Sequence, residues 1–169
     1  LGLLTEEGGR FALPRSLVPL LVEEDSLQFL GGHLDYLALR SLDFDGFDEL
    51  FRDGRRSARR QRHLTEAFAA ATKWDHTAFL DVLLPRAPAL RAALAEGAEV
   101  LDVGSGTGSF ALRVARVFPR ARFVGLDPDA TAVREARART ARAGLEARVA
   151  FEVGWAESMA HRERFDLVY

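Results

Sequence analysis

Residues 99–112 read EVLDVGSGTGSFAL, and this stretch decides the fold class of the chain. A short apolar run ends in an acid, glycines follow at every second position, and the apolar spacing of a helix comes next. The acid and the three glycines are Asp102, Gly104, Gly106 and Gly108. Closely spaced glycines let a backbone turn sharply and approach a ligand without a Cβ in the way. A helix that starts near Thr107 or Ser109 would point unpaired N–H groups at that ligand, so we predict a strand-to-helix turn that binds a nucleoside-bearing cofactor.

A second apolar run, RFVGLDPD at 122–129, follows the predicted helix. Asp127 stands at its carboxyl end, where nucleotide-binding folds place an acid that binds the two ribose hydroxyls. An ionised carboxylate suits this role because it offers paired acceptors to a cis-diol. The alternative interpretation is that Asp127 only caps a helix beginning at Pro128, since Asp before Pro is a common helix start.

The glycine spacing separates this turn from two other nucleotide-binding loops. The dinucleotide fingerprint is G-x-G-x-x-G, whereas here the third glycine comes one residue early and Ser109 stands in its place. No Lys follows the glycines, as a phosphate-binding P-loop would require. The pattern D-x-G-x-G-x-G, followed by an acid that ends the next strand, instead resembles motif I and the post-motif acid of class I S-adenosylmethionine-dependent methyltransferases.

This resemblance implies a cofactor and a role for each residue of the motif. The glycine-rich turn would pack against the methionine half of S-adenosylmethionine, with Asp102 near its ammonium group. Asp127 would bind the ribose, and Pro128 would cover one face of the adenine. The residues of the turn are Gly104, Ser105, Gly106, Thr107 and Gly108.

A third apolar run, VAFEVGWAES at 149–158, resembles the third strand and the adenine-edge loop of the same family. Many relatives carry an Asp directly after the glycine, where it accepts a hydrogen bond from the adenine amino group. Here Trp155 follows Gly154, and an indole N–H donates but cannot accept. Adenine recognition would then use the backbone of Trp155, Ala156 and Glu157, or the Glu157 carboxylate. The alternative is that Trp155 packs as an aromatic side chain under the edge of the sheet.

The order of the predicted elements indicates an α/β fold with a doubly wound, Rossmann-like parallel sheet. The final stretch, FDLVY at 165–169, resembles motif IV, with Asp166 entering a fourth strand. We expect the four strands to be neighbours in the sheet. We also expect the arginines of the helix at 129–143 to form its solvent face. The predicted elements are a strand at 99–103, a helix at 107–118, a strand at 122–127, a helix at 129–143, and strands at 148–153 and 165–169.

We divide the chain into two regions, 1–60 and 61–169. The second would be a class I methyltransferase domain truncated after its fourth strand, because the resemblance implies three more strands beyond it. The chain also begins with Leu1 inside a running pattern, so we interpret it as an interior fragment of a longer protein.

Residues 1–60 differ in residue pattern from the rest of the chain, and their pattern predicts a short hairpin followed by helices. LGLLTEEGGRFALP at 1–14 reads as two strands with Gly8 and Gly9 at the tip, and Pro14 starts a short helix. Ser26 is a candidate cap for the next helix. The apolar stripe expected on that helix is Leu30, Leu34, Leu37 and Leu39. A hairpin ahead of motif I resembles the end of a winged-helix dimerisation domain in small-molecule methyltransferases, so we predict a partial winged-helix-like domain, a linker and a homodimer.

Residues 64–98 are predicted to be helical up to a C-terminal cap at Gly97. The expected core residues are Leu64, Phe68, Phe79 and Leu83. In related enzymes a helix or loop before motif I folds over the cofactor, which makes His76 a candidate for the acceptor site and for a catalytic role. The alternative is that His76, close to Trp74, is a packed or surface residue.

Two further sequence patterns resemble binding sites, but we assign no function to either. Ser41, Asp43, Asp45 and Gly46 look like the start of a calcium loop, but Ser41 and Arg52 stand where that loop needs its first acid and its twelfth-position Glu. We therefore predict no metal site. A cluster of arginines could mark nucleic-acid contact, but acidic neighbours and few interleaved aromatics favour a solvated linker or helix face. These arginines are Arg52, Arg55, Arg56, Arg59, Arg60 and Arg62.

Composition narrows the function classes. The 169 residues carry a formal net charge of −2, so no global field recruits nucleic acid or an anionic membrane. The chain contains no cysteine, which rules out disulfides and Cys-based metal sites. No apolar run approaches the ~20 residues of a membrane span. We expect a soluble, cytoplasmic enzyme that transfers a methyl group from S-adenosylmethionine to a small molecule. The alternatives are an NAD(P)-dependent oxidoreductase, and a winged-helix regulator whose methyltransferase-like domain senses a nucleoside.

Overall fold

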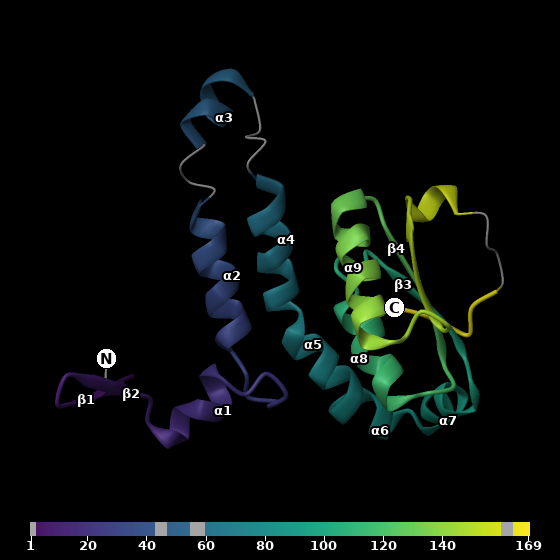
Figure 1. Ribbon diagram of the computed structural model, residues 1–169, viewed down its shortest axis with the longest axis horizontal. Coiled ribbons are helices and arrows are strands. Elements are labelled where there is room, and N and C mark those ends of the chain that lie inside the picture. Colours follow the sequence, from purple (N-terminus) through teal and green to yellow (C-terminus); the bar gives the residue numbers. More distant parts are fainter. Residues whose placement is uncertain (1–2, 43–46, 55–59, 160–163) are drawn as a thin grey trace. The chain divides into compact units, whose positions relative to one another are not determined.

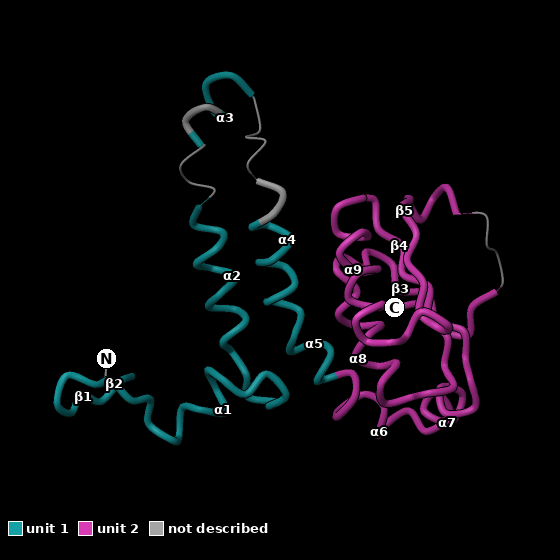
Figure 2. Tube along the Cα trace, in the orientation of Figure 1, with its two compact units in different colours: residues 1–78 teal, residues 79–169 magenta. Residues whose placement is uncertain are grey.

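The computed structural model describes residues 3–42, 47–54, 60–159 and 164–169. The chain divides into two compact units, Leu1–Ala78 and Phe79–Tyr169, which Figure 2 shows in two colours. Residues 43–46, which carry most of the calcium-loop look-alike, and the arginines within 55–59 lie outside the described residues.

Unit 2 is built on four parallel strands in the order β5-β4-β3-β6, of which Figure 1 labels β3 and β4. The strands are β3 (Glu99–Val103), β4 (Arg122–Asp127), β5 (Val149–Val153) and β6 (Leu167–Val168). The helices that connect β3 to β4 and β4 to β5 are α8 (Ser109–Val117) and α9 (Ala130–Ala143). The predicted α/β, Rossmann-like parallel sheet is confirmed, and so is the expectation that the four strands are neighbours.

The strand register brings the carboxyl ends of β3, β4 and β5 to one edge of the sheet. Asp102 pairs with Gly125, Gly125 pairs with Phe151, and Asp127 pairs with Val153. Side chains alternate between the two faces along each strand, so the row Asp102, Gly125 and Phe151 shares one face. The carboxyl edge is where open α/β sheets bind their ligands.

Helix α8 packs on the sheet because one of its sides is apolar. Its buried residues form one core cluster with residues from three strands. Burying a Val, Leu or Phe side chain contributes about 1.5–3 kcal/mol. The helix start is thereby fixed next to the end of β3. The buried residues of α8 are Phe110, Ala111, Leu112, Val114 and Ala115, and the strand residues include Val100, Phe123 and Val149.

A π-helix corrects the predicted core ahead of the sheet. Phe79 is buried as predicted, but Leu83 is 47% exposed, and Leu84 is buried in its place. The prediction assumed an α-helical step of four residues from Phe79, whereas a π-helical turn brings the fifth residue back to the same face. The helical segments here are η3 (Phe79–Leu83), α6 (Leu84–Arg86) and α7 (Pro88–Glu96). Gly97 ends α7 with a φ of 120°, in agreement with the predicted cap.

Unit 1 begins with the predicted antiparallel hairpin and continues as helices. Its two strands are β1 (Thr5–Glu7) and β2 (Arg10–Ala12). The helices are η1 (Arg15–Leu17), α1 (Val18–Leu21), α2 (Gly31–Ser41), α3 (Phe47–Asp53), α4 (Arg60–Ala71) and α5 (Lys73–Ala78). The identity of this unit as part of a winged-helix domain stays a prediction.

The start of α2 differs from the prediction. Ser26 does not cap this helix, because its Oγ accepts a hydrogen bond from the N–H of Gln28 at 3.1 Å. The helix begins at Gly31, and Leu30 before it provides no side-chain cap. The serine therefore stabilises a local turn instead of a helix end.

The prediction that the leucine stripe of α2 faces the core is also wrong. Helices α2 and α4 lie side by side (Figure 1), and α2 approaches α4 through glycine, since a Cβ on Gly32 would overlap the carbonyl group of Ala70. Leu34 and Leu37 consequently lie exposed, while the rings of Tyr36 and Phe68 meet across the two helices with their centroids 5.7 Å apart. The same close approach leaves Phe68, another predicted core residue, half exposed, because alanines of α4 fill the buried positions.

Candidate functional site

The three glycines of motif I have positive φ angles, but for two different reasons. The angles are 73° at Gly104, 52° at Gly106 and 76° at Gly108, a region that other L-residues rarely adopt. A Cβ on Gly104 or Gly106 would meet no atom within 4 Å, so the space beside these residues is open. A Cβ on Gly108 would overlap the ring of Phe151. Packing therefore requires Gly108, whereas Gly104 and Gly106 border space that a ligand can enter.

Asp127 fastens the glycine-rich turn to the end of β4. Its Oδ2 accepts a hydrogen bond from the N–H of Gly106, and its Oδ1 accepts one from the N–H of Asp129, each at 2.8 Å. The alternative that Asp127 caps the following helix is wrong, because Asp129 is the cap. Asp129 Oδ1 accepts from the N–H of Thr131 at 2.8 Å. Asp127 is thus placed at the carboxyl edge, with one oxygen bonded to the turn and the other to the start of the segment before α9.

Asp102 and Ser105 carry buried polar atoms to the same place. Asp102 is 3% exposed and Ser105 is 8% exposed. Among the described residues, Asp102 Oδ2 and Ser105 Oγ have no hydrogen-bond partner. Burial raises the pKa of the Asp102 carboxyl to about 7, the backbone N–H of Ala111 lowers it, and the charge of Asp127 raises it further. Buried polar atoms without partners cost free energy, so a polar ligand group would be stabilised here.

Two arginines of α9 bind backbone and hydroxyl oxygens. Arg137 is exposed, in agreement with the prediction that the arginines form the solvent face of this helix, whereas Arg139 is half-buried and departs from it. Arg137 donates to the carbonyl of Phe151 from Nε at 3.0 Å and from Nη2 at 2.6 Å. Arg139 Nη1 donates to the Thr107 carbonyl at 2.9 Å, to the Thr107 hydroxyl at 2.8 Å and to the Ser109 hydroxyl at 3.0 Å. Their partners lie 14, 30 and 32 residues away in the sequence, so no local pattern identifies these two arginines.

The predicted adenine-edge residues lie exposed after β5. Trp155 is 63% exposed, so the alternative that it packs under the sheet edge is wrong. Ala156 and Glu157 are exposed as well, in the short helix η4 (Ala156–Ser158). The N–H of Gly154 donates to the carbonyl of Asp127 at 3.1 Å, which holds this loop beside the end of β4. Pro128 is exposed too.

His76 is buried within unit 1, in helix α5. This helix is joined to the segment before α2, because Trp74 Nε1 donates to the Leu27 carbonyl at 2.8 Å and Lys73 Nζ lies 2.5 Å from Glu24 Oε1. The burial of His76 agrees with the interpretation of a packed residue. Its role at an acceptor site stays a prediction.

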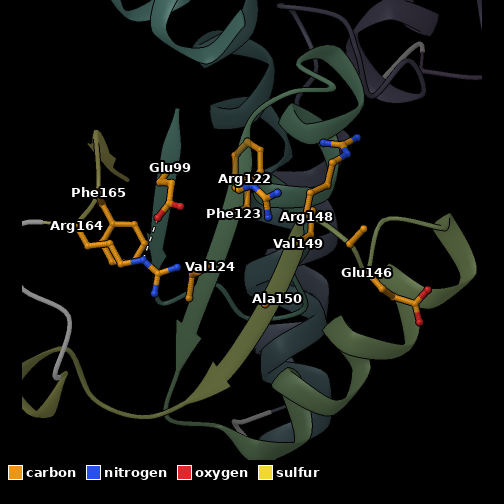
Figure 3. A pocket seen from close by; sticks show the side chains of 11 residues that line it. Glu99, Arg122, Phe123, Val124, Glu146, Arg148, Val149, Ala150, Arg164 and Phe165 are labelled. Atoms are coloured by element: carbon orange, nitrogen blue, oxygen red, sulfur yellow. Dashed lines mark hydrogen bonds and ion pairs between the residues drawn. The ribbon is translucent and has the colours of Figure 1, made fainter. Parts of the chain in front are cut away.

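A hollow lies at the opposite, amino edge of the sheet (Figure 3). It is lined by the first residues of three strands, Glu99, Arg122 and Val149, together with Arg148 and Arg164. Arg164 Nε pairs with Glu99 Oε2 at 2.9 Å, and Arg148 donates to three backbone carbonyls. Since most of these charged groups already bind neighbours, the open turn at the carboxyl edge is the stronger candidate for a ligand site.

In the part of the chain that the structure describes, no group of three or more His, Cys, Asp or Glu side chains is placed to hold a metal ion. No helix in that part is both long enough and apolar enough to cross a membrane.

Comparison with known families explains the arrangement at the carboxyl edge. Residues 94–169 match the model of a family described as a methyltransferase domain. This segment is similar to a methyltransferase domain. The match covers the whole parallel sheet with the glycine-rich turn, Asp127 and the loop after β5.

Individual relatives match this chain over different lengths. The tRNA1(Val) (adenine(37)-N6)-methyltransferase of Porphyromonas gingivalis is 38% identical over 73 residues, which is 40% of this chain and 29% of the relative. The chain therefore spans less than a third of that protein's length. A candidate O-methyltransferase of known structure from Nostoc punctiforme is 20% identical, with a TM-score of 0.55, 99% of this chain covered and 50% of that chain. That likeness supports the fold. An RNA methyltransferase from Salinibacter ruber, solved with S-adenosyl-L-homocysteine, is 31% identical with a TM-score of 0.43, covering 52% of this chain and 56% of that chain.

Proposed function

We propose that the methyltransferase domain binds S-adenosylmethionine at the carboxyl edge of its sheet, and that it belongs to an enzyme that transfers the cofactor's methyl group. The observation that carries this proposal is the open glycine-rich turn, bordered by the buried Asp102 and held by Asp127. The family match of the same segment favours methyl transfer over the oxidoreductase alternative.

The residues around the turn fit the methionine half of the cofactor. Open space lies beside Gly104 and Gly106, and the partnerless Asp102 Oδ2 and Ser105 Oγ border the same turn. An ammonium group carries donors and a positive charge, so it would satisfy the Asp102 carboxylate and favour its ionised form.

The nucleoside half fits the ends of β4 and β5. Each carboxylate oxygen of Asp127 has two lone pairs, so each can accept a ribose hydroxyl in addition to the amide that it already binds. We assign the adenine to the exposed loop Trp155, Ala156 and Glu157, with Pro128 against one of its faces. The indole of Trp155 offers a ring face for stacking, and the backbone of the loop offers the hydrogen bonds.

The chemistry places modest demands on these residues. The bound sulfonium supplies an already activated methyl group, so the chain has to hold the cofactor in one orientation and keep water away from it. The turn, Asp127 and the loop after β5 bind and orient. A general base is needed only where the acceptor arrives protonated.

Two acceptor classes follow from different observations. The resemblance of residues 1–60 to a winged-helix dimerisation domain favours a small molecule, and a homodimer as the working form. The P. gingivalis relative is named for a tRNA adenine, which favours RNA as the second candidate. Incubation with tritiated S-adenosylmethionine and either total tRNA or a protein-free cell extract separates the two. Label in acid-precipitated RNA supports the second candidate, and label only in the soluble organic fraction supports the first.

Cofactor binding is tested by titrating S-adenosylhomocysteine calorimetrically into the wild-type chain, Asp127→Asn and Asp129→Asn. Asparagine at 127 keeps one acceptor oxygen but replaces the other with an NH₂ group, which can only donate and would face a backbone N–H. We therefore expect the affinity for S-adenosylhomocysteine to fall by about tenfold or more. Asparagine at 129 still caps α9, so affinity should stay within about twofold. A folded wild-type chain that ignores S-adenosylhomocysteine, or that binds NADH instead, would contradict the proposal.

A further inference from the structure

One guanidinium group reaches the glycine-rich turn from a different helix. Arg139 lies in the second half of α9, and its Nη1 donates to three oxygens of the turn and of the first residue of α8. All three bonds are 2.8–3.0 Å long, within the normal range for N–H···O bonds. No other side chain of α9 is bonded to this turn among the described residues.

The surroundings of Arg139 show that this contact is not an ordinary surface ion pair. Neighbouring Arg142 pairs with Glu135 at 2.9 Å, and both of those side chains are exposed. Arg139 is half-buried, and its partners in the described part of the chain are uncharged oxygens. Burial lowers the pKa of Arg139. The charge of Glu135 raises this pKa, and the charges of Arg142 and Arg116 lower it further. A cation removed from water and held by neutral acceptors is costly unless those bonds are well made.

The bonds of Arg139 complement those of Asp127. The Asp127 carboxylate holds the N–H of Gly106, while Arg139 holds the carbonyl and the hydroxyl of the next residue, Thr107. Two successive residues of the turn are therefore held by two different side chains. A carboxylate accepts a hydrogen bond from Gly106, and a guanidinium donates hydrogen bonds to Thr107. A turn that is fixed before the ligand arrives loses less conformational entropy when it binds.

We propose that Arg139 is a positioning residue for the cofactor site, which fixes the glycine-rich turn in its binding conformation without touching the ligand. This inference rests on the proposed function, because it assigns the turn to a cofactor. It predicts that loss of the guanidinium weakens cofactor binding far more than it destabilises the fold.

The test compares Arg139→Met, Arg139→Lys and Arg142→Met with the wild-type chain. Affinity for S-adenosylhomocysteine is measured by calorimetry, and the free energy of unfolding by urea titration. We expect Arg139→Met to bind about tenfold more weakly, since several bonds from a charged donor are lost. Arg139→Lys keeps a donor and should recover most of that loss. Arg142→Met, from the exposed ion pair of the same helix, should bind as the wild type does.

A second variant guards against misfolding of Arg139→Met. Ser109→Ala removes one acceptor while the arginine stays, and the double variant with Arg139→Met completes a mutant cycle. If the losses in affinity of the two single variants do not add up in the double variant, Arg139 acts through its contact with Ser109. Equal affinity of Arg139→Met and wild type, or equal weakening by Arg142→Met, would overturn the inference. Absence of any binding by the folded wild type would instead overturn the proposed function, so the two failures are distinguishable.

Discussion

Asp102 carries a carboxyl group into a part of the fold that water reaches poorly. Burial raises its pKa from 3.8 to about 7, so between these pH values the folded chain holds a proton that the unfolded chain has released. The free energy of unfolding must then fall as the pH rises through this window, by a total on the order of 4 kcal/mol, and level off above pH 7. Asp102→Asn should remove this contribution, because the amide does not titrate.

The measurement is a series of urea titrations between pH 4.5 and 8 for the wild type and Asp102→Asn. We expect the variant to gain stability relative to the wild type as the pH rises. Asp81→Asn, an exposed position in η3, is the matched control and should run parallel to the wild type. Parallel curves for Asp102→Asn would show that the carboxyl group is already ionised at low pH.

The individual site residues differ in how far the sequence could reveal them. Asp102, Asp127 and the three glycines lie together because strand ends and turns are encoded by their own neighbours. Arg139 could not be placed in this way, since its partners lie 30 and 32 residues earlier, across the contact between two helices. The same holds for Phe151, whose ring explains why Gly108 must be glycine.

At the scale of the elements, local patterns predicted where segments begin and end, but not which side they bury. All four strands and the helices α8 and α9 were predicted within a few residues. Helix α2 was predicted as well, but with its leucines inward, because spacing alone cannot reveal that glycines form the contact with α4. The π-turn of η3 likewise shifted burial from Leu83 to Leu84, which α-helical spacing does not anticipate.

Strand β4 offers a sharp test of element packing. A Cβ on Gly125 would overlap the ring of Phe151 and would lie 2.8 Å from the Cβ of Ser105. Gly125→Ala should therefore lower the free energy of unfolding by about 1–3 kcal/mol, the usual cost of overpacking. Urea titration measures the change. The double variant with Phe151→Leu should recover part of the loss, because the smaller side chain makes room.

Gly154→Ala is the matched control for that experiment. Its Cβ would meet only the flexible end of Leu126, at 3.2 Å, so the cost should stay below about 1 kcal/mol. If Gly125→Ala proved as mild as Gly154→Ala, the ring of Phe151 could not be packed over β4 as described.

At the scale of the whole molecule, the residues assigned to the cofactor all belong to unit 2. They come from β3, β4, β5 and the turns that follow these strands, within Phe79–Tyr169. Their hydrogen bonds, including those from α9, also stay within this unit. A fragment of residues 72–169, which keeps α5 as a helical leader, should therefore unfold cooperatively and bind S-adenosylhomocysteine within about threefold of the complete chain. Calorimetry on the two proteins, after circular dichroism has shown that the fragment is folded, gives the comparison. A folded fragment that binds much more weakly would show that residues before 72 contribute to the cofactor site, and would direct the search for the acceptor pocket to unit 1.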